Sequence, residues 1–275
     1  MATHLDQILA SVRREVEQRK SASDRAALEE QAARHTPRGF AAALRCAATT
    51  GPAVIAELKK ASPSRGLIRP EFDPPSLARA LAANGAAALS VLTEEQFFQG
   101  SLENLRIASA ATTIPCLRKD FIVDEWQILE ARAACADAIL LIAAALTDAE
   151  LRRFTEAAHA LQLDVLCEVH DAEETRRVQD LGCDAVGVNN RNLRTFAVRL
   201  ETSLELIESL PAAAVRVAES GINTAADLVR LRDAGFHAFL IGESLMRHAE
   251  PGEALRDLLN AAHPTRPRQE AVPCG

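Results

Sequence analysis

An acidic and a basic side chain lie close together at the end of an apolar run, AVIAELKKASPS, at residues 53–64. Successive side chains of a strand point to opposite faces, so Glu57 and Lys59 would share one face and Lys60 would lie on the other. Burying an acid and a base costs free energy unless they pair. The pattern therefore indicates either an acid–base site or a surface ion pair where the strand reaches solvent.

Polar residues also end six further apolar runs of the chain. If these ends converge on one pocket, their side chains could move protons and hold a polar substrate. The residues are Thr93, Glu94 and Glu95; Arg118, Lys119 and Asp120; Glu168 and His170; Asn189, Asn190 and Arg191; Glu219, Ser220 and Gly221; and Gly242 and Glu243.

The elements that would position these residues follow one repeating pattern from residue 53 onward. A short apolar run, a loop and an amphipathic helix recur eight times, which predicts alternating strands and helices. The runs are continuously apolar, as in a parallel sheet covered by helices. Eight units predict an α/β protein with a closed (β/α)8 TIM barrel, because closure removes both sheet edges, and its active site would lie at the strands' carboxyl ends. An open doubly wound sheet is the alternative, but it requires a glycine-rich turn where the sequence has KKAS.

The chain is predicted to have three parts. Residues 1–52 form an N-terminal helical extension, with apolar residues at helical spacing near the start, a polar segment to about residue 34 and a second helix over 39–47. The barrel occupies 53–260. The proline-rich tail, 261–275, is predicted to be disordered.

Composition narrows the classes of partner. The chain is 48% hydrophobic and has a net charge of −7, which is typical of a globular protein and provides no global attraction for nucleic acid. No run is long and apolar enough to span a membrane, and the N-terminus lacks the apolar core of a signal peptide. The six cysteines form no CxxC pair, so no zinc site and no metal are predicted, and the location is expected to be cytoplasmic.

Glycines at the ends of the seventh and eighth predicted strands indicate an anion site. Gly221 and Gly242 would let backbone N–H groups approach a ligand, and a short helix follows Gly242. Loops at these positions commonly bind phosphate in this fold. We therefore expect backbone contacts from Gly221, Gly242 and Glu243, with the Glu243 side chain pointing away from the anion. The alternative is that both glycines only permit tight turns.

Seven motifs, in this order and spacing, resemble the indole-3-glycerol phosphate synthase family of tryptophan biosynthesis. They are AELKKASPSRG, LTEEQFFQGS, CLRKDFIVDEWQI, CEVHD, GVNNRNL, VAESGI and FLIGESLM. The resemblance extends to about residue 260 and implies a carboxy-lyase without metal or organic cofactor. It would convert 1-(2-carboxyphenylamino)-1-deoxyribulose 5-phosphate into indole-3-glycerol phosphate, carbon dioxide and water.

The resemblance also implies roles for individual residues. Lys119 would be the general acid, with its pKa lowered by the apolar residues that follow it. Lys59 would be the second catalytic lysine and would pair with the substrate carboxylate or phosphate, and Glu168 would exchange protons in the dehydration. Glu57 would hold the lysines, and Asn189 and Glu219 would orient the substrate. The substrate-binding positions would be Arg191, Ser220, Ser62, Phe98, Phe121, Leu140 and Ile142.

The remaining polar residues near these motifs are interpreted more simply. Lys60, Arg65 and Arg118 are assigned to the surface or to loops, and His170 to a loop at a helix start. The expected partner is a small phosphorylated substrate, and the expected state a monomer or weak homodimer.

Two other functions stay open. One is another phosphate-binding barrel, such as phosphoribosylanthranilate isomerase or the tryptophan synthase α subunit, although the first and third predicted strands carry lysines instead of the acidic or cysteine residues of those enzymes. The other is a non-catalytic binding barrel, which would need no acid–base residues at its rim.

Overall fold

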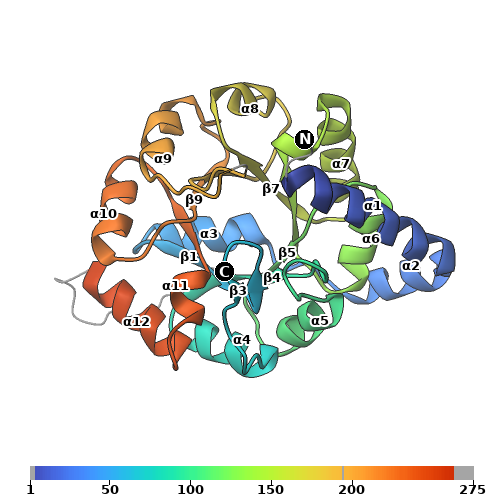
Figure 1. The fold of residues 1–275 in the computed structure, drawn as a ribbon, viewed down its shortest axis with the longest axis horizontal. Coiled ribbons are helices and arrows are strands. Elements are labelled where there is room, and N and C mark those ends of the chain that lie inside the picture. Colours follow the sequence, from blue (N-terminus) through green and yellow to red (C-terminus); the bar gives the residue numbers. More distant parts are fainter. Residues whose placement is uncertain (1–3, 194, 263–275) are drawn as a thin grey trace.

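Eight parallel strands close into a barrel in the computed structural model, which describes residues 4–193 and 195–262 (Figure 1). The hydrogen-bonded order is β1-β10-β9-β8-β7-β6-β5-β4, and β4 pairs back with β1. This order confirms the predicted (β/α)8 barrel and excludes the open sheet. The barrel strands are β1 (Ala53–Leu58), β4 (Ala86–Leu92), β5 (Cys116–Lys119), β6 (Ala138–Ile142), β7 (Asp164–Val169), β8 (Ala185–Asn189), β9 (Val215–Glu219) and β10 (Ala238–Ile241).

Helices surround the barrel, and the alternation of side chains along each strand separates two cores. In β1, Val54, Ala56 and Leu58 pack outward with the helices, whereas Ala53 and Ile55 pack inside the barrel. Glu57 follows the inward set, so the same alternation directs it into the barrel mouth. The outer elements are α4 (Pro74–Ala83), α5 (Leu102–Ala110), α6 (Trp126–Ala133), η1 (Ala143–Ala145), α7 (Asp148–Ala160), α8 (Ala172–Arg177), α9 (Glu201–Leu206), η2 (Ile207–Ser209), α10 (Ala225–Asp233), α11 (Glu243–Met246) and α12 (Pro251–Ala262).

Local caps explain where several helices begin. Thr147 and Glu150 form a capping box at the start of α7, and Thr224 and Asp227 do the same for α10. Each box satisfies backbone N–H groups that the first helical turn leaves unpaired.

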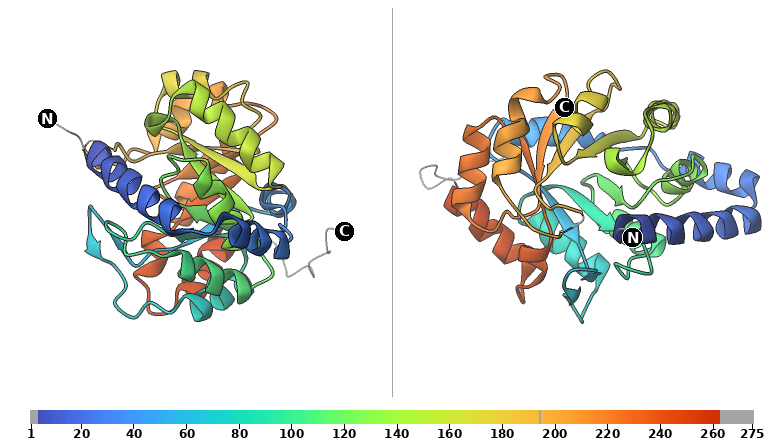
Figure 2. Two further views of the ribbon diagram at one scale, coloured as in Figure 1. Left: turned by 90° about the vertical axis from the view of Figure 1, so that its right-hand side faces the viewer. Right: turned by 45° about the horizontal axis from the view of Figure 1, so that its top comes forward.

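The N-terminal extension contains three helices, α1 (His4–Ala22), α2 (Arg25–Arg34) and α3 (Phe40–Ala48). The first and third were predicted, whereas α2 lies in the segment that was described only as polar and was not predicted as a helix. Asp24 caps α2 by accepting hydrogen bonds from two backbone N–H groups, and only Ala32 of this helix is buried. The apolar periodicity was therefore too weak to reveal it. Phe40 of α3 packs into the barrel's inner core, while α1 passes in front of α6 in Figure 1 and is seen along its length in Figure 2.

The two ends of the barrel domain differ slightly from the prediction. A short antiparallel hairpin, β2 (Ala61–Ser62) and β3 (Gly66–Leu67), occupies the loop after β1. Helix α12 continues through Ala262, so it enters the segment assigned to the tail. Residues 263–275, where disorder was predicted, lie outside the described residues. Among the described helices, none is long and apolar enough to cross a membrane.

Candidate active site

The carboxyl ends of five strands bring five predicted site residues together inside the barrel mouth. The three glutamates are almost fully buried, with exposures of 1–2%, and Asn189 is also buried. Their grouping follows from the barrel, because parallel strands end at one rim. They are Glu57 on β1, Lys119 on β5, Glu168 on β7, Asn189 on β8 and Glu219 on β9.

Lys119 lies between two of these carboxylates. Its Nζ is 3.4 Å from Glu168 Oε2 and 3.9 Å from Glu219 Oε2. Burial alone would lower the pKa of Lys119, but the charges of Glu168, Glu219 and Glu57 outweigh it, and the pKa is raised. The prediction of a lowered pKa for Lys119 is therefore wrong. The apolar neighbours are present, but the sequence could not show how many carboxylates would face the ammonium group.

Glu57 and Lys59 form an ion pair at the end of β1. The Glu57 side chain is only 2% exposed and that of Lys59 20% exposed, which excludes the alternative of a solvent-exposed pair. Burial alone would raise the pKa of Glu57, but Lys59 and Lys119 outweigh it, and the pKa is lowered. The carboxylate is thus held ionised next to both lysines.

Glu168 is held by neighbours on three sides. Asn189 Nδ2 donates to its Oε1 over 3.0 Å, and His170 Nε2 lies 3.2 Å from the same oxygen. Burial would raise the pKa of Glu168, but Lys119, His170 and Asn189 reverse the shift and lower it. Glu168 is accordingly a carboxylate near neutral pH.

His170 lies in the loop between β7 and α8, as predicted, but its side chain is part of the site. Its Nδ1 is 3.0 Å from Glu174 Oε2, so the imidazole bridges two carboxylates. Burial would lower the pKa of His170, but Glu168 and Glu174 raise it to about 10. The His170 Nε2 contact with Glu168 Oε1, at 3.2 Å, is an ion pair.

The surroundings of Glu219 shift its pKa in the opposite direction to those of Glu57 and Glu168. Burial, together with the charges of Glu168 and Glu57, raises the pKa of Glu219 to about 8, although Lys119 opposes the shift. Its Oε1 is buried without a hydrogen-bond partner among the described residues. Gly187 makes room for it, since a Cβ there would lie only 2.1 Å from Glu219 Oε1. One glutamate that can carry a proton thus sits beside two that are ionised.

A cavity opens above these groups, and one wall is apolar. Phe98 and Phe121, whose ring centroids are 6.2 Å apart, line it with Leu140, Ile142 and Ser62, as predicted. Further lining residues come from α1 and from the loop after β8, and they were not predicted. The sequence carries no signal for those of α1, because this segment has the pattern of any amphipathic helix. The missed residues are His4, Leu5, Ile8, Leu193 and Phe196.

The predicted anion site lies beside this cavity, at the ends of β9 and β10. Ser220, Gly221 and Gly242 line it together with Arg191. Gly221 has a φ of 79°, which favours glycine, and a Cβ there would come within 2.5 Å of Val198. Gly242 also has a packing reason, because a Cβ would lie 2.9 Å from the Cβ of Glu57.

Glu243 was predicted to point away from the anion site, and this is wrong. Its carboxylate lies 3.2 Å from the Arg65 guanidinium, 2.9 Å from that of Arg247 and 3.6 Å from that of Arg191. It lines the cavity wall with Arg65. Arg65 belongs to the loop after β1, as predicted, but faces the site. Two of these three arginines, Arg65 and Arg191, line the cavity, and their charges explain why Glu243 turns inward.

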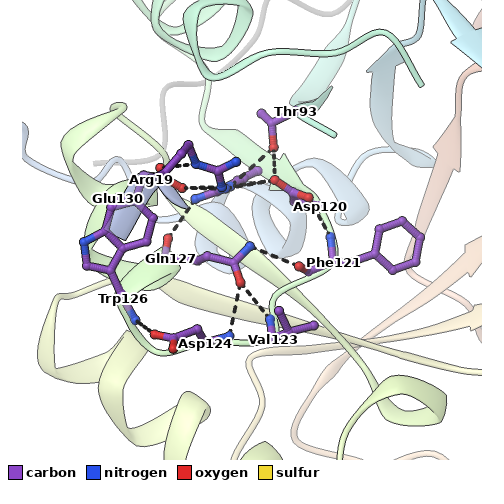
Figure 3. Close-up of polar contacts among 10 residues, drawn as sticks. Arg19, Thr93, Asp120, Phe121, Val123, Asp124, Trp126, Gln127 and Glu130 are labelled. Atoms are coloured by element: carbon purple, nitrogen blue, oxygen red, sulfur yellow. Dashed lines mark hydrogen bonds and ion pairs between the residues drawn. The ribbon is translucent and has the colours of Figure 1, made fainter. Parts of the chain in front are cut away.

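Arg118 was assigned to the surface or to a loop, and this is also wrong. It lies on β5 and is 0% exposed, with Asp120 and Glu130 as its ion-pair partners at 2.9 and 2.8 Å. Figure 3 shows the polar contacts around these two carboxylates. In the described part of the chain, no three His, Cys, Asp or Glu side chains group in a way that could hold a metal ion.

Comparisons with known proteins identify one family. The family model for indole-3-glycerol phosphate synthase matches residues 5–258. The indole-3-glycerol phosphate synthase of Koribacter versatilis is 59% identical over 94% of this chain and 100% of its own length. That of Burkholderia vietnamiensis is 51% identical over 93% of this chain and 98% of its own length.

Solved structures with much lower identity share the fold. A mandelate oxidase bound to benzoyl-formic acid has a TM-score of 0.58 at 18% identity and covers 86% of this chain and 90% of its own. Thiamine phosphate pyrophosphorylase from Pyrococcus furiosus has a TM-score of 0.58 at 17% identity, covering 78% of this chain and 95% of its own. These two likenesses concern the barrel alone, whereas the family match and the two close relatives show that the chain belongs to the indole-3-glycerol phosphate synthase family.

Proposed function

We propose that this enzyme is a carboxy-lyase of tryptophan biosynthesis that converts 1-(2-carboxyphenylamino)-1-deoxyribulose 5-phosphate into indole-3-glycerol phosphate. The observation that carries the proposal is Lys119, an ammonium group held between Glu168 and Glu219 at the floor of a cavity with one apolar side and one side that includes Arg65 and Arg191. Ring closure needs a proton donor next to the reacting atoms, and Lys119 could supply the proton. The apolar side of the cavity suits the aromatic ring of the substrate, and the arginines suit its phosphate.

In the proposed first step, Lys119 is the general acid. The ring carbon that bears the carboxylate attacks the ketone carbon, and the ketone oxygen takes a proton from Lys119 as the carbon–carbon bond forms. The raised pKa of Lys119 keeps it protonated in the free enzyme. An oxygen that is becoming an alkoxide is a stronger base than a lysine amine, so the transfer is downhill at the transition state. Loss of carbon dioxide then returns the bonding electrons to the ring.

Dehydration completes the indole. Here we assign Glu168 as the base, because its lowered pKa keeps it ionised and ready to accept a proton. Lys59, ion-paired with Glu57, supplies the proton for the departing hydroxyl group. Asn189 donates to Glu168 and holds the orientation of its carboxylate. Glu219, with its pKa of about 8, can donate a hydrogen bond to a substrate hydroxyl.

Substrate binding is proposed to use both walls of the cavity. The anthranilate ring packs against Phe98, Phe121, Leu140 and Ile142. Removing the apolar surface of the ring from water favours this contact. The phosphate lies at Gly221 and Gly242, where Ser220 and Arg191 also line the site, and the backbone N–H of Glu243 begins a short helix. Lys59 lines both cavities and can therefore contact the substrate carboxylate or phosphate.

The decisive experiment is a fluorescence assay for indole-3-glycerol phosphate with the purified enzyme, the carboxyphenylamino substrate and EDTA in the buffer. The expected result is turnover that EDTA does not change. A parallel assay with phosphoribosylanthranilate tests the isomerase alternative. Absence of indole product, or turnover of phosphoribosylanthranilate instead, would contradict the proposal.

A further inference from the structure

Arg118 is among the largest fully buried side chains of the described protein and lies next to the proposed general acid. Side chains alternate along β5, so Arg118 points outward to the helix layer while Lys119 points into the barrel. Arg118 pairs in register with Val91 of β4, and Lys119 pairs with Leu92. A contact that fixes Arg118 on the outer face therefore also fixes the direction of Lys119 on the inner face.

The Arg118 guanidinium is bound on all of its edges. Nη2 donates to Asp120 Oδ2 over 2.9 Å and to Glu130 Oε2 over 2.8 Å, and Nη1 donates to the Gln127 carbonyl over 2.8 Å. An isolated buried charge would be strongly destabilising. The planar fork of arginine suits these several acceptors, which a lysine ammonium could not reach together.

The same network holds the loop that follows Lys119. Thr93 Oγ1 donates to Asp120 Oδ2 over 2.6 Å, and Asp120 Oδ1 accepts the Phe121 backbone N–H over 2.8 Å. Gln127 closes the loop from α6, because its Oε1 accepts from the Val123 N–H and its Nε2 donates to the Phe121 carbonyl. Figure 3 shows these side chains meeting between the strand end and α6. Phe121, which lines the cavity, is thus positioned by the same contacts.

The N-terminal extension completes the network. Arg19 of α1 donates to both oxygens of Glu130, over 2.9 and 3.3 Å, and its guanidinium lies 5.9 Å from the centroid of the Trp126 ring (Figure 3). Two arginines therefore balance Asp120 and Glu130. The other end of α1 contributes Leu5 and Ile8 to the cavity wall. One helix is thus connected both to the substrate cavity and to the back of the strand that carries Lys119.

We propose that Arg118 is a positioning residue for Lys119, and that Arg19 of α1 completes the ion network through which Arg118 acts. The inference rests on the proposed function, since it concerns the acid of that reaction. Helix α1 would thus take part in catalysis in addition to contributing Leu5 and Ile8 to the cavity wall.

The test compares Arg118→Lys and Arg118→Met with a matched control, Arg38→Met. Arg38 also binds a buried carboxylate, Asp137, which precedes β6 at the opposite end of the barrel. We expect kcat to fall about tenfold for Arg118→Lys and about 100-fold for Arg118→Met, as for small displacements of a catalytic group. KM should change less than kcat, because the network contacts no residue of the predicted anion site and positions only Phe121 of the apolar wall. Arg38→Met should lower Tm but not kcat. Unchanged kcat in folded Arg118→Met would overturn the inference, as would equal losses of kcat in Arg118→Met and Arg38→Met.

Two milder variants keep the inference testable if Arg118→Met does not fold. Thr93→Val removes the donor to Asp120 at nearly constant volume, and Arg19→Met removes a cation whose side chain is 35% exposed. Each should lower kcat by about threefold or more without raising KM. If both leave kcat unchanged, the network does not position Lys119. Turnover by the wild type distinguishes the two hypotheses. An inactive wild type would refute the proposed function. An active wild type whose variants keep its kcat would refute only this inference.

Discussion

Lys119 Nζ and Glu168 Oε2 lie 3.4 Å apart in the barrel mouth, with side-chain exposures of 16% and 2%. The two residues come from β5 and β7, separated by β6, and neither is close to the other in the sequence. Each shifts the pKa of the other toward the charged form. The free enzyme therefore holds a charged ammonium group and a carboxylate in contact, as the proposed proton transfers require.

Substitution of the proposed acid is the first prediction. Lys119→Met should lower kcat by about 100- to 10,000-fold, the usual contribution of a positioned acid or base. Binding of a reduced substrate analogue, measured by calorimetry, should be largely kept because the anion site is intact. Lys60→Met is the matched control, since Lys60 lies in the loop after β1 and lines neither cavity. Equal activity of both variants would refute the role of Lys119.

The second prediction concerns pH and stability at His170. The pKa of this group rises from 6.5 to about 10 on folding, so the folded state binds the proton more tightly. The resulting stabilisation is fully present below pH 6.5 and is lost as the pH rises toward 10. His170→Asn should therefore lower the free energy of unfolding by about 1–3 kcal/mol at pH 6 and by much less at pH 10.

Urea unfolding of wild type and variant at both pH values measures this difference. His159→Asn serves as a control, because that histidine pairs with Asp184 where its side chain is 42% exposed. A difference for His170→Asn that is constant between the two pH values would contradict the assignment.

The third prediction separates binding from chemistry. Arg191 lines the proposed phosphate site, whereas Arg247 contacts Glu243 without lining either cavity. Arg191→Met should raise KM about 10- to 100-fold, the effect of losing a charged hydrogen bond to phosphate, with a smaller change in kcat. Arg247→Met should leave KM within about twofold. Steady-state kinetics of the two variants measure both KM values. A larger rise in KM for Arg247→Met than for Arg191→Met would show that phosphate binds elsewhere.

The fourth prediction tests the space beside Glu219. Gly187→Ala would place a Cβ 2.1 Å from Glu219 Oε1, so the carboxyl group must move. We expect at least a tenfold loss of kcat, roughly what a shift of a group at the reacting centre costs. Gly182→Ala is the comparison, because its φ is 71° but nothing lies within 4 Å of the added carbon. It should cost about 1 kcal/mol of stability without changing kcat. If Gly187→Ala has the same kcat and KM as the wild type, the position of Glu219 does not matter for the reaction.

Much of the fold was encoded in local patterns that a sequence shows directly. Eight apolar runs with amphipathic helices between them predict a closed parallel barrel, because few other arrangements bury both faces of such strands. The barrel in turn predicts that Glu57, Lys119 and Glu168 meet at one rim. Helix α2 was not predicted because it buries little surface, so its apolar residues show no clear helical period.

The tertiary structure decided what those residues experience. Whether Lys119 gains or loses affinity for its proton depends on how many carboxylates face it, and these come from strands far apart in the sequence. The burial of Arg118, the inward turn of Glu243 and the contribution of α1 to the cavity depend likewise on partners brought by folding. The sequence alone determined which chemical groups reach the rim, since strand period and strand order follow from local patterns. Their charge states and orientations were decided only in three dimensions, because electrostatic energies depend on distance and burial rather than on spacing along the chain.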